Sequence, residues 1–325
     1  MLRIGGHLDL PGGEIKRFST EFLELKNPME PPWKFLKEPA LLKRIGIVVK
    51  PNKPEAVSVA RELIGWLGRK NVGVALDPFV ASSLNPALAC PREKIGLEVD
   101  LLVVLGGDGT LLSAARHLDE EKVPILGVNL GGLGFLTEIT LEELYPVLDR
   151  ILAGKMETER RMRLKVTVIR QGEKVGEYTI LNDAVISKTV LARIIHLRNS
   201  VDGAYVTTYR GDGVIICTPT GSTAYSLAAG GPIVYPSLDS VLITPICPHT
   251  LTNRPLLIPD RATVEFILET EESDVRLTLD GQVGCNLLPY DRICITKADN
   301  HVLFIKSPHR DYFEILRTKL KWGAR

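Results

Sequence analysis

Residues 44–155 alternate between short unbroken apolar runs and longer segments with helical spacing. The run from Ile45 to Val49 ends at Lys50-Pro51, which predicts a buried strand. The next segment, 54–69, places these apolar residues on one helical stripe: Val57, Ala60, Leu63, Ile64 and Leu67. Further apolar runs predict strands at 72–76, 101–105 and 124–128. The run at 101–105 does not alternate, so we expect it to be buried on both faces, as in a parallel sheet.

The pattern changes after a helix that is predicted from a capping box. Thr140-Leu-Glu-Glu143 has the capping-box spacing, and the helix is expected to extend to about Ala153. Beyond Lys155 the apolar runs are short, often alternating, and separated by glycine or charged turns, which predicts antiparallel strands. These runs are 164–170, 177–181, 204–209, 263–268 and 275–279. The sequence therefore predicts an α/β N-terminal domain with a Rossmann-like parallel sheet, followed by a β-rich C-terminal domain with antiparallel sheets.

The hydrophobic pattern divides the chain into four predicted segments. Residues 1–42 are punctuated by proline and glycine and have no long periodic run, so they form an N-terminal extension. The α/β domain spans 43–155 and the β-rich domain spans 156–300. A C-terminal segment, 301–325, has helical spacing from Tyr312 to Leu320 and basic residues near its end, as a helix C-terminus prefers.

Charge and cysteine usage narrow the class of protein. The 325-residue chain has 40 Lys and Arg against 39 Asp and Glu, a net charge of +1, so it lacks the basic surplus of a nucleic-acid binder. Its five cysteines are scattered and contain no Cys-x-x-Cys pair, which fits a reducing compartment and argues against a zinc site. No apolar stretch is long enough to span a membrane, and no signal peptide is recognisable. We expect a cytoplasmic protein with neither a nucleic-acid nor a membrane partner.

The first candidate site follows the strand at 101–105. Gly106-Gly107-Asp108-Gly109 forms the turn, and a helix is expected to open at Thr110. Glycines let the backbone approach a ligand, and a helix N-terminus favours an anion. We therefore expect Gly106, Gly107, Gly109 and Thr110 to bind phosphate. A carboxylate beside phosphate is unfavourable unless it handles a hydroxyl proton or a metal, as phosphoryl transfer requires.

Other interpretations of this turn are possible. Asp108 could be a simple helix cap in a tight turn. The segment is neither the Gly-x-Gly-x-x-Gly fingerprint nor a Walker loop, since no Gly-Lys-Ser/Thr follows. A second glycine-rich loop, Gly127 to Leu136, follows the strand at 124–128, and it could bind a ligand or serve packing alone. In a parallel sheet both loops lie beyond the carboxyl ends of their strands, where open α/β folds bind ligands.

Two more segments place polar groups beside apolar strands. Asn182-Asp183 interrupts an apolar run, which suits ribose hydroxyls or an adenine edge but is also a common turn pair. In 218–232, the hydroxyls of Thr220, Ser222 and Thr223 crowd the start of a short helix, which suggests an anion or polyol site. A serine-hydrolase elbow is excluded, because Gly221-Ser222 lacks the second glycine.

The remaining polar candidates are weaker. His249 lacks a histidine partner at ligand spacing, so a zinc site is not expected and a structural histidine is the simpler reading. Asp280-Gly281 is a hairpin turn signal, with Gln282 next to it. We predict no metal site built from this chain's own residues.

Taken together, these segments resemble the NAD kinase family. The matching segments, in chain order, are 106–109, 129–136, 182–183, 218–232 and 248–251, and the resemblance covers about residues 44–310. The Gly-Gly-Asp-Gly turn alone is shared with lipid kinases and resembles that of phosphofructokinases, whereas the segment 218–232 is far more specific. The resemblance implies transfer of a phosphoryl group from ATP, or a related donor, to the 2′-hydroxyl of the adenosine ribose of NAD.

The resemblance also assigns roles to residues. Asp108 matches the family's proton acceptor for the NAD 2′-hydroxyl. Positions that match NAD contacts are Gly109, Asn182, Asp183, Arg193, Arg210, Asp212, Thr223, Ala224, Tyr225, Ser226, Leu227, Ala228 and Gln282. Position 183 is often Glu in the family, and Asp there shortens the reach without changing the charge. Further implications are Mg²⁺ accompanying ATP, a homodimer or homotetramer, and a last segment that returns to the first domain.

Two competing functions remain at this stage. A lipid or sugar kinase could share the Gly-Gly-Asp-Gly turn, although a lipid kinase should have an apolar groove that is not evident here. A non-catalytic NAD-sensing module could keep the glycine loops, but it would have no need of Asp108.

Overall fold

The computed structural model describes residues 42–118, 123–189, 194–271 and 274–323, so the predicted N-terminal extension lies almost wholly outside the described residues. Within the described ranges, no helix combines the length and apolarity needed to cross a membrane.

The first sheet is built around parallel strands. Its order is β2-β1-β3-β4-β19-β6, and β5 also pairs with β4. All pairs among the first five strands are parallel, with bounds β1 Arg44–Val49, β2 Gly73–Leu76, β3 Leu101–Gly106, β4 Ile125–Asn129 and β5 Ile139–Thr140. Every residue of β3 is buried, as its unbroken apolar run predicts.

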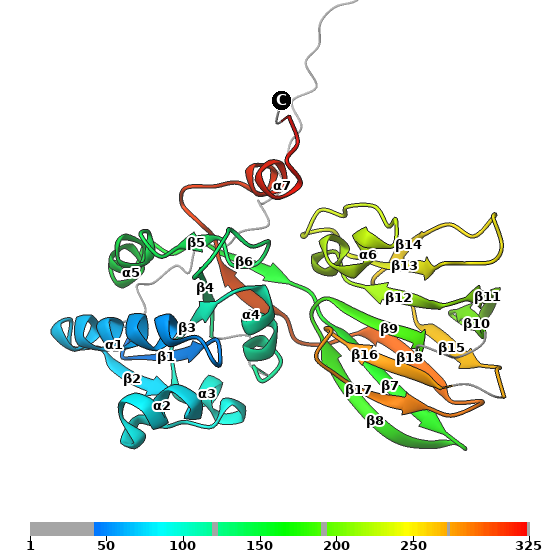
Figure 1. Cartoon of the computed structure of the whole chain (residues 1–325), viewed down its shortest axis with the longest axis horizontal. Helices are drawn as coiled ribbons and strands as arrows, with labels where there is room; N and C mark the ends of the chain where they lie inside the picture. The colour runs from blue at the N-terminus through cyan, green and yellow to red at the C-terminus, as the bar shows by residue number, and fades with distance from the viewer. Residues whose placement is uncertain (1–41, 119–122, 190–193, 272–273, 324–325) are drawn as a thin grey trace, which may run out of the picture. The chain divides into compact units, whose positions relative to one another are not determined.

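Helices cover both faces of this sheet (Figure 1). They are α1 Pro54–Arg69, α2 Pro78–Leu84, the 3₁₀ turn η1 Pro86–Leu88, α3 Arg92–Glu98, α4 Asp108–Ala115 and α5 Leu144–Leu152. Alternate residues of β3 belong to different cores: Val103 packs with α1, α2 and α5, whereas Val104 packs with α3 and α4. The strand thus separates two apolar layers and carries α4 at its carboxyl end.

The β-rich part consists of two six-stranded sheets with orders β11-β10-β15-β18-β7-β8 and β14-β13-β12-β9-β16-β17. Among the described residues, the strand pairs within these two sheets are antiparallel. The bounds are β7 Leu164–Arg170, β8 Glu173–Ile180, β9 Asp183–Lys188, β10 Ile195–Val201, β11 Ala204–Gly211, β12 Gly213–Cys217, β13 Ser240–Ile246, β14 Leu256–Pro259, β15 Val264–Leu268, β16 Val275–Leu279, β17 Val283–Leu287 and β18 Arg292–Lys297. Their inward residues, such as Phe266 and Ile186, form one core.

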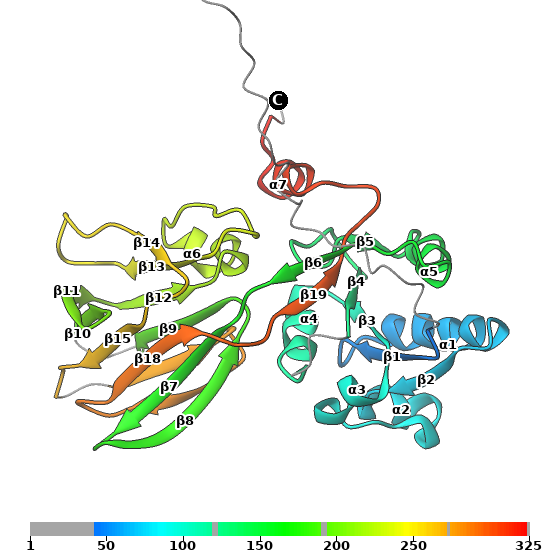
Figure 2. The ribbon, with the colours of Figure 1, turned by 180° about the vertical axis from the view of Figure 1, so that it is seen from behind.

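Two strands connect this sandwich to the first sheet. β6 (Thr158–Arg161) precedes β7, and β19 (Val302–Ile305) follows β18; the two pair with each other, with Arg161 opposite Val302. β19 also pairs with β4 through Phe304 and Ile125. Both views of the ribbon show β6 and β19 between the two groups of strands (Figures 1 and 2). The helix α7 (Tyr312–Leu320) follows.

The predicted fold class is confirmed, with differences at element boundaries. Helix α4 begins at Asp108, two residues before the predicted start. Helix α5 begins at Leu144; the N–H of Thr140 donates to Glu143 (2.9 Å), which is one half of the expected capping box. The Asp280-Gly281 turn is confirmed, because β16 and β17 pair on either side of it and both residues have left-handed φ angles, 49° and 66°.

Candidate active site

The turn between β3 and α4 presents main-chain groups at the carboxyl edge of the first sheet. A Cβ on Gly106 would lie 2.5 Å from the hydroxyl oxygen of Thr110, so this packing requires glycine. At Gly107 a Cβ would meet nothing within 4 Å. The first N–H groups of α4 have no acceptor within the helix, so this turn could bind an anion.

Asp108 is not a helix cap. The N-cap of α4 is Gly107, without a side-chain cap, and the Asp108 carboxylate turns toward the second glycine-rich loop. Oδ1 accepts hydrogen bonds from the N–H of Leu136 (3.1 Å), the N–H of Thr137 (3.0 Å) and the hydroxyl of Thr137 (2.9 Å). Oδ2 accepts from the N–H of Phe135 (2.9 Å). The carboxylate therefore ties the two glycine-rich loops together.

The second loop is fixed by Asn129, the last residue of β4. Its amide nitrogen donates to the Thr137 hydroxyl oxygen (2.7 Å), and its amide oxygen accepts from the N–H of Gly131 (2.7 Å). Asn129 and Thr137 are both buried. The sequence analysis did not name either side chain as a site residue. An amide at the carboxyl end of a buried strand does, however, indicate a polar group that needs hydrogen-bond partners.

A second turn, at 181–183, is held by a carboxylate from the β16–β17 hairpin. Asp280 accepts from the N–H groups of Leu181 (3.1 and 3.2 Å), Asn182 (2.7 Å) and Asp183 (3.2 Å). Its own N–H donates to the carbonyl of Asp183 (2.8 Å). Leu181 packs in the same apolar cluster as Leu111 of α4, so this turn lies against the first sheet's helix layer.

Burial raises the pKa of both carboxyls of this turn, and the charge of Asp280 acts further on Asp183. Burial, followed by the negative charge of Asp280, raises the pKa of Asp183 to about 7. Burial also raises the pKa of Asp280, opposed by the three N–H groups that it accepts from. Asp183 is therefore partly protonated near neutral pH and can both donate and accept hydrogen bonds.

Gln282 connects the β-rich part to the Gly-Gly-Asp-Gly turn. Its amide nitrogen donates to the carbonyl of Gly109 (2.6 Å), and its amide oxygen accepts from Arg116 (3.0 Å). Two predicted site residues from distant parts of the sequence thus touch directly.

Several hydroxyls of the segment 218–232 already donate to partners within the protein. Ser222 donates to the carbonyl of Pro219 (2.7 Å), and Thr223 donates to that of Thr220 (3.3 Å), within the 3₁₀ turn η2 Thr220–Thr223. Ser226, in α6 (Tyr225–Ala228), is buried and bonds with the Thr244 hydroxyl (2.8 Å). These hydroxyls satisfy internal partners, because a tight turn leaves carbonyls that need donors.

The other predicted NAD contacts differ in their exposure and in their partners. Tyr225 is 47% exposed, whereas Asn182 is packed so tightly against Gly221 that a Cβ there would lie 2.2 Å from the Asn182 carbonyl oxygen. Asp212 pairs with Lys188 (2.8 Å), a residue that sequence reasoning missed, and Arg210 is exposed. Arg193 lies outside the described residues.

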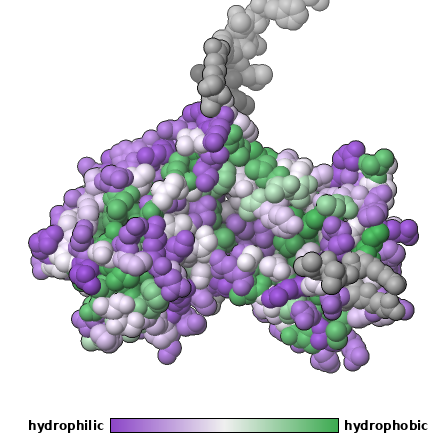
Figure 3. All heavy atoms as spheres, in the orientation of Figure 1, coloured by the Kyte–Doolittle hydropathy of each residue, from purple (hydrophilic) through white to green (hydrophobic). Residues whose placement is uncertain are grey.

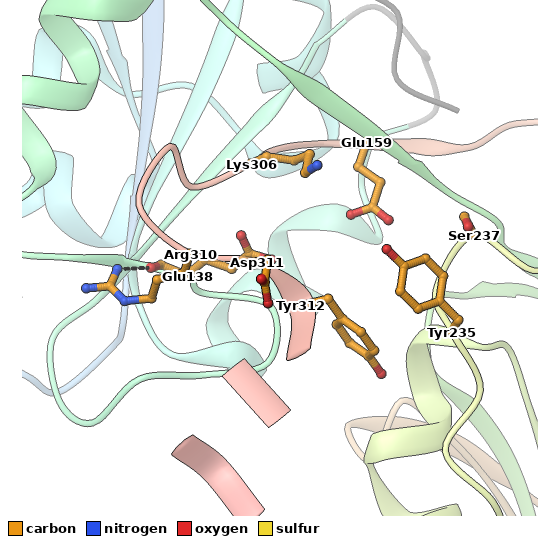
Figure 4. A pocket seen from close by; sticks show the side chains of 8 residues that line it. All are labelled: Glu138, Glu159, Tyr235, Ser237, Lys306, Arg310, Asp311 and Tyr312. Atoms are coloured by element: carbon orange, nitrogen blue, oxygen red, sulfur yellow. Dashed lines mark hydrogen bonds between the residues drawn. The ribbon is translucent and has the colours of Figure 1, made fainter. Parts of the chain in front are cut away.

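A cavity of about 80 Å³ is lined by a different set of residues (Figure 4). Its charged walls are already paired: Arg310 makes two 2.7 Å bonds to Glu143, and Glu138 accepts from the N–H of Ser307 (3.1 Å). It is lined by Glu138, Glu159, Tyr235, Ser237, Lys306, Arg310, Asp311 and Tyr312. None of these is a predicted site residue.

Both parts of the chain match models of known protein domains. Residues 45–156 match the ATP-NAD kinase N-terminal domain, and residues 181–307 match the ATP-NAD kinase C-terminal domain. The NAD kinase of Geotalea daltonii is 50% identical over 284 residues, covering 87% of this chain and 100% of the relative. The NAD kinase of Syntrophotalea carbinolica is 51% identical over 285 residues, with the same coverage.

Solved structures show the same architecture. The yeast NADH kinase complexed with NADH superposes with a TM-score of 0.83 at 27% identity, covering 92% of this chain and 93% of that one. An NAD kinase from Archaeoglobus fulgidus in complex with ATP gives a TM-score of 0.68 at 27% identity, covering 85% of this chain and 99% of that one. Fold and site together define a nucleotide-binding phosphotransferase. The chain belongs to the NAD kinase family.

Proposed function

We propose that this protein transfers the γ-phosphoryl group of ATP to the 2′-hydroxyl of the adenosine ribose of NAD, with Asp108 as the proton acceptor. The observation that carries the proposal is the bond between Gln282 and the carbonyl of Gly109. It brings the Gly-Gly-Asp-Gly turn, suited to phosphate, against the hairpin whose Asp280 holds Asn182-Asp183.

The turn at 182–183 supplies groups for the ribose and the adenine. The Asn182 amide oxygen is buried and has no hydrogen-bond partner among the described residues, so a ligand N–H or O–H would satisfy it. Tyr225 offers an exposed ring nearby, and the Lys188–Asp212 pair offers further polar atoms. Main-chain groups of 223–228 complete the proposed NAD site, because the Thr223 and Ser226 hydroxyls already have partners.

The donor phosphates would lie on the open side of Gly107 and Gly109, at the N-terminus of α4. Within the described ranges, no three His, Cys, Asp or Glu side chains are grouped to hold a metal ion. We therefore treat Mg²⁺ as part of the donor substrate, since Mg²⁺ in phosphoryl-transfer sites is bound largely by the nucleotide phosphates and water.

The geometry of Asp108 indicates which oxygen receives the proton. A carboxylate offers about four lone-pair positions, two on each oxygen. Oδ1 already accepts three hydrogen bonds from described residues, whereas Oδ2 accepts one, from Phe135. Oδ2 is thus the oxygen that can accept the ribose hydroxyl. In a loose phosphoryl-transfer transition state a carboxylate contributes mainly by orienting that hydroxyl and taking its proton late.

The test is incubation with ATP, Mg²⁺ and NAD, followed by detection of NADPH through a coupled dehydrogenase. We expect NADPH to form, and we expect Asp108→Asn to lower kcat by at least about 100-fold while calorimetry shows NAD binding largely kept. Equal losses of binding and turnover would contradict the proton-acceptor role. Phosphorylation of diacylglycerol in place of NAD would instead favour a lipid kinase.

Assembly and compartment complete the proposal. We propose a homodimer or homotetramer, which sedimentation analysis would check. All five cysteines are free thiols, which supports a reducing compartment such as the cytoplasm.

A further inference from the structure

A hydrogen-bond relay runs from the end of β4 to the carboxylate at the start of α4. The Asn129 amide nitrogen donates to the Thr137 hydroxyl oxygen (2.7 Å), and that hydroxyl donates to Oδ1 of Asp108 (2.9 Å). Thr137 has no exposed surface, and Asn129 is 8% exposed. The relay joins the carboxyl ends of two neighbouring strands, β3 and β4.

The direction of the relay is fixed by its ends. The Asn129 amide oxygen accepts from the N–H of Gly131 (2.7 Å), so the amide nitrogen must face Thr137. A hydroxyl that accepts from an amide nitrogen has its own proton free to donate, and the acceptor within reach is Oδ1 of Asp108. The Thr137 hydroxyl is thus held as a donor to the carboxylate.

The Thr137 hydroxyl increases a difference between the two oxygens of Asp108 that the main-chain N–H groups already create. The Thr137 hydroxyl is the third hydrogen bond to Oδ1, and Oδ2 keeps its second lone pair. Without the hydroxyl, Oδ1 would still accept from the N–H groups of Leu136 and Thr137, but the side chain would lose one of the bonds that fix its rotation. Misplacement of a reacting group by about 1 Å can cost about 100-fold in rate.

We propose that Thr137 is a positioning residue that orients Asp108 so that only Oδ2 receives the ribose hydroxyl. This inference rests on the proposed role of Asp108. Thr137 itself touches no substrate, so its effect should fall on kcat rather than on the binding of NAD or ATP.

The first test compares Thr137→Val with Thr137→Ser. Val keeps the branched shape and removes the hydroxyl, whereas Ser keeps the hydroxyl and removes the methyl group. We expect Thr137→Val to lower kcat by about 10- to 100-fold with KM for NAD and ATP within about threefold. Thr137→Ser should keep kcat within about threefold of the parent. A Thr137→Val enzyme with unchanged kcat, or equal losses in both variants, would overturn the inference.

A second variant redirects the hydroxyl without removing it. In Asn129→Asp a carboxylate replaces the donor amide and competes with Asp108 for the Thr137 proton, while it can still accept from Gly131. We expect a loss of kcat similar to that in Thr137→Val, and unchanged kcat would again overturn the inference. This variant also provides the test if Thr137→Val fails to fold.

Asp108→Asn is measured in parallel to separate the proton-acceptor role of Asp108 from the positioning role of Thr137. If Asp108→Asn keeps full kcat, the proposed role of Asp108 fails and the inference fails with it. If Asp108→Asn loses activity while Thr137→Val and Asn129→Asp do not, only the positioning role of Thr137 fails.

Discussion

Gln282 and Gly109 are 173 residues apart in the sequence, yet the Gln282 amide donates a 2.6 Å hydrogen bond to the Gly109 carbonyl. The same side chain accepts from Arg116 at the other end of α4 (3.0 Å). One exposed amide thus holds the β16–β17 hairpin to both ends of the helix that begins with Asp108.

Gln282→Leu should therefore weaken NAD binding more than turnover. An exposed hydrogen bond contributes about 1 kcal/mol, so we expect KM for NAD to rise by about fivefold, with kcat within about threefold. Steady-state kinetics would measure both. Arg116→Met is the matched control, since it removes the contact with Arg116 and leaves the Gly109 bond; an equal rise in KM there would contradict a specific role for that bond.

The Asp183–Asp280 pair predicts how stability depends on pH. The pKa of Asp183 is raised to about 7 in the folded protein from an ordinary value of 3.8. Between these values the folded state holds a proton that the unfolded state has released. This contribution to stability is therefore full below about pH 4, decreases as the pH rises, and is lost once the pH exceeds about 7.

Asp183→Asn should remove this pH dependence, because the amide cannot ionise. We expect the gain in stability of the variant over the parent to be larger at pH 8 than at pH 5, by up to about 3 kcal/mol. Urea unfolding without NAD, at both pH values, measures the effect. The same difference in unfolding midpoint at pH 5 and pH 8 would show that Asp183 does not titrate in this range.

The local parts of the fold were readable from the sequence, and the long-range pairings were not. The run 101–105 and its glycines sit together in the chain, so the strand, the turn and the helix could be predicted. β6 has the sequence Thr-Glu-Arg-Arg and gives no apolar signal; its pairing of Arg161 with Val302 depends on a strand far along the chain. For that reason the sequence did not predict that β6 connects the first sheet to the β-rich part.

In the site, too, a local turn could be predicted from the sequence, whereas a contact between distant residues could not. Asp280-Gly281 was recognised as a hairpin turn, because the left-handed turn has a local signature. That the Asp280 carboxylate would bond to the N–H of Asn182, 98 residues earlier, follows only from the sheet order that places β16 beside β9. The Ser222 and Thr223 hydroxyls, in contrast, donate to carbonyls three residues earlier, which is a local pattern that Ser and Thr often form.

Tyr312, at the start of α7, has a buried hydroxyl with no hydrogen-bond partner among the described residues. Its ring packs edge-on against Tyr235 (centroids 5.1 Å apart), so the ring contributes contacts and the hydroxyl contributes a desolvation penalty. Tyr312→Phe should leave stability unchanged or raise it by up to about 1 kcal/mol. Tyr312→Ala should lower it by about 2 kcal/mol through lost ring contacts. Thermal unfolding of both variants checks this, and a marked loss in Tyr312→Phe would reveal a partner for the hydroxyl.

Gly134 is the glycine most tightly coupled to Asp108. A Cβ at this position would lie 2.1 Å from Oδ1 of Asp108 and 2.3 Å from the Thr137 hydroxyl oxygen, so either the carboxylate or the loop must move. Gly132, two residues earlier in the same loop, has nothing within 4 Å of its Cβ position and has no left-handed φ angle.

Gly134→Ala should therefore lower kcat by about 100-fold or more, because in the proposed role of Asp108 the displaced carboxylate no longer meets the ribose hydroxyl. Gly132→Ala should keep kcat within about twofold, since its methyl group enters open space. Both variants lose the same conformational freedom, so the comparison isolates the contact with Asp108. Full activity in Gly134→Ala, or equal damage in the two variants, would mean that the position of Asp108 does not limit phosphoryl transfer.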